Sequence, residues 1–241
     1  MRDSAFRRLS DLSSMSAGAP VVTIDGPSGS GKGTVAQIIA DRLGWHFLDS
    51  GALYRLVGLA AFRAGASLSD APALVAIARD MDITFVPRPG DIPAVLLDGA
   101  EAGEELRTEA NGERASLVAI IPDVRAALLQ KQRDFRRFPG LVADGRDMGT
   151  TVFPDALLKV FLTASPEVRA ERRYKQLKEK GFDANLPRLL GEIRDRDARD
   201  SARTASPLKP AADASILDTS TLSISEVVGQ IERLLRSRLG S

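Results

Sequence analysis

The stretch from residue 21 to residue 43 constrains the fold of this chain most strongly. It begins with VVTID (21–25), a short apolar run rich in β-branched side chains, which predicts a buried parallel strand. It ends with residues 34–43, whose apolar side chains recur at helical spacing and predict a helix packed against a core. A glycine-rich loop joins the two segments, and the order of strand, loop and helix predicts an α/β fold.

The loop contains GPSGSGK (26–32), in which Gly26, Gly31 and Lys32 stand at the offsets of the motif G-x-x-x-x-G-K. Glycines let backbone N–H groups turn toward phosphate oxygens, and the following helix presents its positive end. A glycine-rich turn without a ligand is the alternative, but the flanking strand and helix favour a phosphate-binding loop. The residues predicted to bind a nucleoside triphosphate are Gly26, Pro27, Ser28, Gly29, Ser30, Gly31, Lys32, Gly33 and Thr34.

One position departs from the general motif. Gly33 stands where the motif has a serine or threonine hydroxyl, and Thr34 follows one residue late. That hydroxyl normally binds the Mg²⁺ that accompanies the nucleotide. We therefore predict no direct metal ligand in this loop, and expect Thr34 to act through a water molecule.

The composition excludes several other kinds of site. The chain of 241 residues has no cysteine, which rules out disulfides and thiolate chemistry and fits a cytoplasmic protein. Its one histidine, His46, cannot form a histidine metal cluster, and we assign it no catalytic role. The formal net charge of +1 argues against a nucleic-acid polymer as partner. No run approaches the ~20 apolar residues that span a membrane.

The remaining chain alternates between strand and helix patterns. Further strands are predicted at 45–48, 141–143, 157–162 and 214–217. Helices are predicted at about 52–64, 117–135 and 185–203, with another that opens at Ser165-Pro166 and a last one that begins near Ser223. The pattern predicts an α/β domain at 20–238, a five-stranded parallel sheet with helices on both faces. Residues 1–19 read as a disordered leader.

Two regions differ from this alternation. Residues 66–115 contain short strands at 83–86 and 94–97 between turns rich in Pro and Gly, which predicts a small β-containing insert. Residues 165–184 form a polar, arginine-rich helical segment with few large apolar side chains. Such a segment suits a mobile lid as well as a solvated surface helix, and the pattern does not separate the two.

The helix at 185–203 carries charges where its apolar stripe should continue. Its apolar face passes into Arg196, Asp200 and Arg203, and burying those charges is costly unless they are paired or meet a ligand. This favours a polar cleft over a helix that simply leaves the core. Arg125, on the flank of another apolar stripe, reads by itself as an arginine whose stem is buried.

Polar residues also follow the predicted strands at their carboxyl ends, where parallel sheets bind ligands. Asp49 and the DGRD segment at 144–147 both occupy such positions. If a bound phosphate accepts the phosphoryl group, its second pKa of about 6 leaves it largely ionised, and no general base is needed. A sugar or alcohol acceptor would instead need a carboxylate base, for which Asp49 and Asp147 are candidates.

Several segments together resemble one family. IDGPSGSGKGT (24–34), LDSGALYR (48–55), ADGRDMGTTVFPDA (143–156) and IRDRDARDSAR (193–203) are similar to segments of bacterial cytidylate kinases, which are nucleoside monophosphate kinases. The third segment is specific to that family and differs from its pattern only at Thr151. The resemblance covers almost the whole chain from residue 21 to residue 235.

The resemblance implies a phosphate-loop kinase with a small insert that binds the monophosphate (66–115) and a helical lid (165–184). It implies transfer from ATP to CMP or dCMP, with Mg²⁺ as cofactor, by a cytoplasmic monomer. The implied catalytic residues are Lys32, Arg172, Arg173 and Arg196. The implied CMP ligands are Ser50, Arg55, Arg125, Arg146, Asp147, Arg196, Asp200 and Arg203. Asp147 would accept a hydrogen bond from the cytosine amino group.

Two other functions stay open from the residues alone. A small-metabolite kinase on the same core would use Asp49 as the base for a hydroxyl acceptor. A nucleotide-binding regulator without phosphoryl transfer would account for the late threonine as weakened Mg²⁺ binding.

Overall fold

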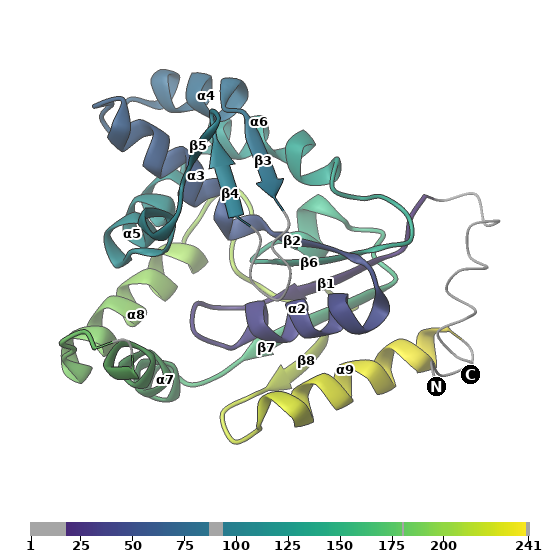
Figure 1. The fold of residues 1–241 in the computed structure, drawn as a ribbon. Coiled ribbons are helices and arrows are strands. Elements are labelled where there is room, and N and C mark those ends of the chain that lie inside the picture. The colour runs from purple at the N-terminus through teal and green to yellow at the C-terminus, as the bar shows by residue number, and fades with distance from the viewer. Residues whose placement is uncertain (1–17, 87–93, 180, 240–241) are drawn as a thin grey trace. The chain divides into compact units, whose positions relative to one another are not determined.

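The structure is a computed structural model that describes residues 18–86, 94–179 and 181–239 (Figure 1). Two compact units divide the chain. The first contains the residues up to Asp49 and from Gln132 onward, and the second runs from Ser50 to Lys131. The leader predicted at 1–19 falls almost entirely outside the described residues.

The first unit is built on a five-stranded parallel sheet in the order β2-β6-β1-β7-β8 (Figure 1). The strands are β1 (Val21–Asp25), β2 (His46–Asp49), β6 (Leu141–Gly145), β7 (Leu158–Thr163) and β8 (Ser215–Asp218). The five parallel strands predicted from the sequence are thereby confirmed. The apolar run of β1 lies at the centre of the sheet, where all five of its residues are buried.

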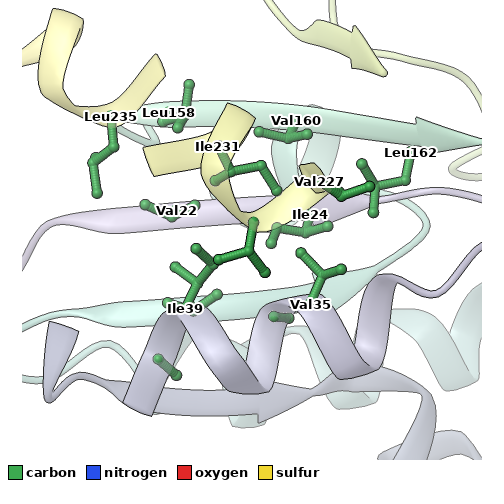
Figure 2. Close-up of a cluster of buried hydrophobic side chains, with 14 of the residues drawn as sticks. Val22, Ile24, Val35, Ile39, Leu158, Val160, Leu162, Val227, Ile231 and Leu235 are labelled. Carbon is green, nitrogen blue, oxygen red and sulfur yellow. The ribbon is translucent and has the colours of Figure 1, made fainter. Parts of the chain in front are cut away.

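Helices and one helical turn complete the described part of this unit. They are α2 (Lys32–Leu43), the π-helical turn η3 (Met148–Val152), α7 (Pro166–Glu179), α8 (Leu186–Ser201) and α9 (Ile224–Arg238). Helices α2 and α9 pack against the central strands through an apolar cluster that includes Ile24, Ile39, Val160 and Ile231 (Figure 2). Burying such side chains contributes about 1.5–3 kcal/mol each, so β1 and α2 hold the glycine loop between two fixed elements.

The second unit consists of helices and a small antiparallel sheet. Its helices are α3 (Ser50–Arg63), α4 (Ala71–Asp80), η2 (Glu104–Arg107), α5 (Glu109–Val118) and α6 (Pro122–Arg133), the last of which runs across the boundary into the first unit. Its sheet has the order β3-β4-β5, with β3 (Ile83–Val86), β4 (Ala94–Leu97) and β5 (Ala100–Glu101). The strands predicted at 83–86 and 94–97 are confirmed, whereas α4 was not predicted.

The prediction of one long helix at 117–135 is wrong. The chain forms two helices there, because α5 ends at Val118 and α6 starts at Pro122. Proline is well tolerated at the first position of a helix and cannot continue the hydrogen bonding of a preceding one. Arg125 donates to the carbonyl oxygen of Ala119 at 3.1 Å and so satisfies an acceptor at the end of α5.

Within the described ranges, no helix is both long enough and apolar enough to cross a membrane.

Candidate active site

The glycine loop lies between β1 and α2 and has the backbone that its sequence predicts. Gly31 is the N-cap residue of α2 and has φ 87°. Because glycine has no side chain, it does not cap the N–H groups in the first turn of α2. The positive end of the helix is therefore presented at Lys32, as an anion-binding loop requires. A Cβ at Gly26 would lie 2.1 Å from the carbonyl oxygen of Leu162, so this position excludes every larger residue.

Lys32 is buried beside two aspartates, Asp49 and Asp144, near the carboxyl ends of the neighbouring strands β2 and β6. Its Nζ donates to the carbonyl oxygen of Pro27 at 3.2 Å and lies 3.9 Å from Oδ1 of Asp144. The register of β2 against β6 places Asp49 opposite Asp144. Burial lowers the pKa of Lys32 below its ordinary value, and the charge of Arg146 lowers it further. Burial raises the pKa of Asp144, while the lysine opposes that rise.

The structure gives a reason for the glycine that replaces the usual hydroxyl residue. A Cβ at Gly33 would lie 3.0 Å from Oδ2 of Asp144, tighter than nearly all real contacts of this kind. Gly33 therefore leaves room for the Asp144 carboxylate to approach the first turn of α2. Thr34, one residue later, is exposed. Gly33, which departs from the general motif, thus stands where the Asp144 carboxylate packs directly against the loop.

Asp25, the last residue of β1, fixes the segment that follows β6. Its two carboxylate oxygens accept hydrogen bonds from the backbone N–H groups of Met148 and Gly149, at 2.9 and 2.8 Å. Burial raises the pKa of Asp25 to about 6, although these two hydrogen bonds oppose the rise. Asp147 immediately precedes the two donors and is itself 3% exposed. Asp25 therefore fixes the backbone that directly follows the predicted base-reading carboxylate.

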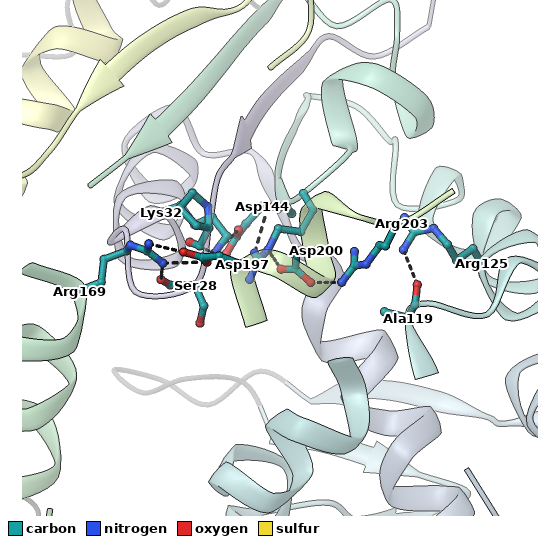
Figure 3. A network of polar contacts seen from close by, with 12 residues as sticks. Ser28, Lys32, Ala119, Arg125, Asp144, Arg169, Asp197, Asp200 and Arg203 are labelled. Atoms are coloured by element: carbon teal, nitrogen blue, oxygen red, sulfur yellow. Dashed lines mark hydrogen bonds and ion pairs between the residues drawn. The ribbon is translucent and has the colours of Figure 1, made fainter. Parts of the chain in front are cut away.

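Asp200 on α8 is the centre of a buried charged network in this unit (Figure 3). It is 1% exposed; its Oδ2 accepts from Nε of Arg146 at 2.9 Å, and its Oδ1 accepts from Arg203. Burial disfavours the ionised carboxylate, but the charges of Arg146, Arg203 and Arg196 outweigh it and hold the pKa of Asp200 below its ordinary value. The prediction that Asp200 pairs with Arg203 is confirmed, although Arg203 lies just beyond the end of α8 at Ser201.

Arg196 belongs to the same neighbourhood. Its charge acts on Asp200 and also lowers the pKa of Lys32, so it lies within electrostatic range of both groups. The charged residues that continue the apolar stripe of α8 therefore lie near other charged groups, as expected if this part of the helix lines a polar cleft. Arg196 thus adds a third positive charge, with Lys32 and Arg146, to the aspartates near the loop, and such charges can bind phosphate groups.

The two arginines predicted to act from the lid have different surroundings. Arg172 donates to the carbonyl oxygen and to Oγ1 of Thr219, and Oγ1 of Thr219 in turn donates to the loop carbonyl of Ser30 at 3.1 Å. Arg173 donates to Oε1 of Gln176 at 3.5 Å. Arg172 is thus already engaged near the phosphate loop, while Arg173 contacts a residue of its own helix.

The three remaining predicted CMP ligands belong to the second unit. Ser50 is buried at the start of α3. Arg55 donates to the carbonyl oxygen of Leu106 at 3.1 Å, and the buried Arg125 lies over the ring of Tyr54 at 5.3 Å in addition to its bond to Ala119. Arg55 and Arg125 are therefore held in place by contacts within this unit.

Four residues that shape the site are absent from the predicted ligands. Asp25 ends β1, and this position was a signal that could have identified it, as it marked the DGRD segment that contains Asp144. Arg169 on α7 and Asp197 on α8 pair with one another, and no local pattern indicates that these two charges meet.

Comparison with known proteins identifies the family. Residues 22–237 match the family model described as cytidylate kinase. The chain is 58% identical to a cytidylate kinase of Burkholderia ambifaria over 218 residues, 90% of this chain and 93% of the relative. It is 56% identical to a cytidylate kinase of Pseudomonas entomophila over 225 residues, 93% of this chain and 99% of that one.

A solved shikimate kinase from Acinetobacter baumannii matches at 16% identity with a TM-score of 0.46, covering 97% of this chain and 99% of that one. The matches to the family model and to the two relatives cover nine-tenths of the sequence. By these matches, the chain belongs to the cytidylate kinase family and is a nucleoside monophosphate kinase.

Proposed function

We propose that this kinase transfers the γ-phosphoryl group of ATP, in line, to the phosphate of CMP or dCMP and forms CDP or dCDP. The buried network around Asp200 is the observation that supports an acceptor site most strongly. Three arginines surround one carboxylate there, and two of them, Arg146 and Arg196, also act on the phosphate-loop lysine. An excess of positive charge next to a phosphate loop suits a second, phosphate-bearing ligand.

The reaction needs orientation and charge stabilisation more than proton transfer. The acceptor phosphate has a second pKa of about 6 and is therefore largely ionised at neutral pH. No side chain has to remove a proton from it, which agrees with the absence of a catalytic histidine or cysteine. Lys32 turns from the carbonyl oxygen of Pro27 to the β- and γ-phosphates, and Arg196 holds the acceptor phosphate.

The residues beside the loop fit a Mg²⁺ ion. Oδ1 of Asp144 is buried, and no group in the described residues donates a hydrogen bond to it. A carboxylate oxygen without a donor, close to a phosphate loop, is the kind of ligand that Mg²⁺ prefers. Asp144 would hold the ion directly or through water, and the hydroxyl of Thr34 would contribute through water. The ion would neutralise charge on the phosphates of ATP.

The family resemblance implies the residues that recognise the acceptor nucleotide. Asp147 accepts from the cytosine amino group, and Arg146 contacts the base. Asp200 and Arg203 contact the sugar and the base. The predicted ligands of the second unit are Ser50, Arg55 and Arg125. Arg172 and Arg173 assist at the transferred phosphate.

On the family resemblance, we expect a monomer that works in the cytoplasm. The insert at 66–115 and the lid at 165–184 stay predictions about which parts bind the monophosphate and which part closes over the ligands.

Substitution of the loop lysine tests this function. Lys32→Ala should lower the rate of ADP formation from ATP and CMP by ~100-fold or more, because a preorganised charge at the transferred phosphate is lost. Lys209→Ala removes an equivalent charge from an exposed position and is the matched control. Circular dichroism should report the same fold for both variants. A folded Lys32→Ala variant with near-wild-type turnover would contradict the proposal.

A further inference from the structure

Arg169 on α7 is a charged side chain in an almost fully buried position. It is 2% exposed, although it belongs to the polar stripe of 165–184 that the sequence places on a lid or on the surface. Burial of a charge is costly unless the charge is paired and hydrogen-bonded. Its surroundings therefore explain why this arginine is tolerated inside the unit.

Its guanidinium group joins three segments that lie far apart in the sequence (Figure 3). Nε donates to the carbonyl oxygen of Ala164, just after β7, at 2.9 Å. One terminal nitrogen donates to the carbonyl oxygen of Ser28, in the phosphate loop, at 3.1 Å. The two terminal nitrogens also bind the two carboxylate oxygens of Asp197 on α8. Such a two-pronged ion pair fixes both distance and orientation.

The contact with the loop is also one of close packing. A Cβ at Gly29 would lie 3.1 Å from Cβ of Arg169, so the loop backbone rests directly on α7 at this point. A shift of the loop at Ser28–Gly29 would disturb its contacts with Arg169, and a shift of Arg169 would disturb its ion pair with Asp197. Displacement of the loop is thereby linked to displacement of α8.

Asp197, the residue of α8 that pairs with Arg169, is close in sequence to the predicted acceptor ligands. Asp197 directly follows Arg196 and lies three residues before Asp200, less than one helical turn away. We infer that Arg169 and Asp197 are positioning residues that hold the phosphate loop and α8 at a fixed separation, so that donor and acceptor phosphates meet in line. This inference rests on the proposed function, since it takes Arg196 and Asp200 as acceptor ligands.

A second ion pair between the same two helices provides a control. Glu167 on α7 and Arg194 on α8 are joined at 2.7 Å, but their side chains are 54% and 59% exposed. Among the described residues, neither side chain of this pair is hydrogen-bonded to the phosphate loop. An exposed pair of this kind contributes little to stability. Its removal therefore tests whether any link between α7 and α8 suffices.

The test removes the buried link without leaving an unpaired buried charge. Arg169→Met combined with Asp197→Leu replaces both partners by apolar side chains, which is compatible with folding. Asp197→Asn is the single variant, Asp197→Glu keeps the carboxylate, and Glu167→Gln is the control. The measurements are kcat for CMP phosphorylation, the Kd of each nucleotide alone by calorimetry, and the thermal midpoint of unfolding.

We expect the double variant and Asp197→Asn to lose ~10- to 100-fold in kcat, because misalignment of about 1 Å has effects of this size. The Kd values of ATP and CMP, measured singly, should change by less than about 3-fold, since uniform binding is retained. Asp197→Glu should keep a larger share of kcat than Asp197→Asn, and Glu167→Gln should match the wild type.

A double variant that folds and keeps kcat within about 2-fold of the wild type would overturn the inference. So would an equal loss of kcat in Glu167→Gln. If the wild type itself did not phosphorylate CMP, the proposed function would fail instead, and the two failures are therefore distinguishable.

Discussion

The buried carboxyl of Asp25 leads to a prediction about how stability depends on pH. Its pKa rises from an ordinary 3.8 to about 6 in the folded protein, mainly through burial. Because the folded state binds the proton more tightly than the unfolded state, this group favours folding at low pH. Its contribution declines as the pH rises from the unfolded pKa to the folded pKa.

The size of this effect follows from the two pKa values. Each pKa unit corresponds to about 1.36 kcal/mol, so the full difference costs the folded state about 3 kcal/mol at high pH. Between about pH 4.5 and pH 7.5, about 2 kcal/mol of this should be lost. Asp25→Asn abolishes the titration but keeps the shape of the side chain. The stability of Asp25→Asn relative to the wild type should therefore rise by about 2 kcal/mol across this range.

Urea unfolding of both proteins, without nucleotide, at a series of pH values measures this difference. Asp80→Asn, which alters an exposed carboxylate at the end of α4, is the control and should follow the wild type. Other carboxylates contribute equally to wild type and variant, so only the difference between the two curves is informative. Parallel curves for the wild type and Asp25→Asn would refute the assignment of a raised pKa to this group.

Two further predictions concern the base-reading carboxylate and the glycine at the start of the loop. Asp147→Asn should lower kcat/KM for CMP, with a loss of transition-state stabilisation of about 1–3 kcal/mol, the value of one base-edge contact. Unchanged kinetics for CMP relative to UMP would exclude a role of Asp147 in base recognition. Gly26→Ala should lower the free energy of unfolding by more than ~2 kcal/mol, since its Cβ would meet the carbonyl oxygen of Leu162 at 2.1 Å. The matched Gly191→Ala, in α8 with open space around its Cβ, should instead stabilise the protein by up to ~1 kcal/mol in chemical denaturation. Equal effects of the two glycine substitutions would contradict the packing argument.

The parallel sheet and the phosphate loop could be predicted because their signals are local. The apolar run of 21–25, the glycine offsets and the helical stripe that follows are all visible within some twenty residues of sequence. The charged continuation of α8 was also visible, because its periodicity is unbroken up to Arg203. Local periodicity suffices where the physics that forms the element is itself local.

The break between α5 and α6 could not be read from periodicity. The apolar stripe at helical spacing continues on both sides of Pro122, so the pattern resembles that of one long helix. The proline was the available signal, and it outweighs the stripe because it lacks the N–H that an uninterrupted helix requires. The bond from Arg125 to Ala119, which completes the end of α5, depends on the fold of the turn.

Arg169 shows why part of the site could not be predicted. Its helix is dominated by charged residues, and its own charge is typical of an exposed position. Its partners Ser28 and Asp197 are 141 and 28 residues away along the chain, and only the fold brings them together. The same holds for Asp25, whose two hydrogen-bond donors come from residues 123 and 124 positions later.

The identity of the phosphoryl acceptor is the central claim, and a transfer assay with γ-labelled ATP and Mg²⁺ tests it most directly. The purified protein is offered CMP, dCMP, UMP, AMP and GMP in parallel with shikimate and gluconate, and labelled products are separated and counted. We predict label in CDP and dCDP, with CMP and dCMP the most efficient acceptors. Label transferred to a hydroxyl of shikimate or gluconate but not to CMP, or no transfer to any acceptor, would contradict the account.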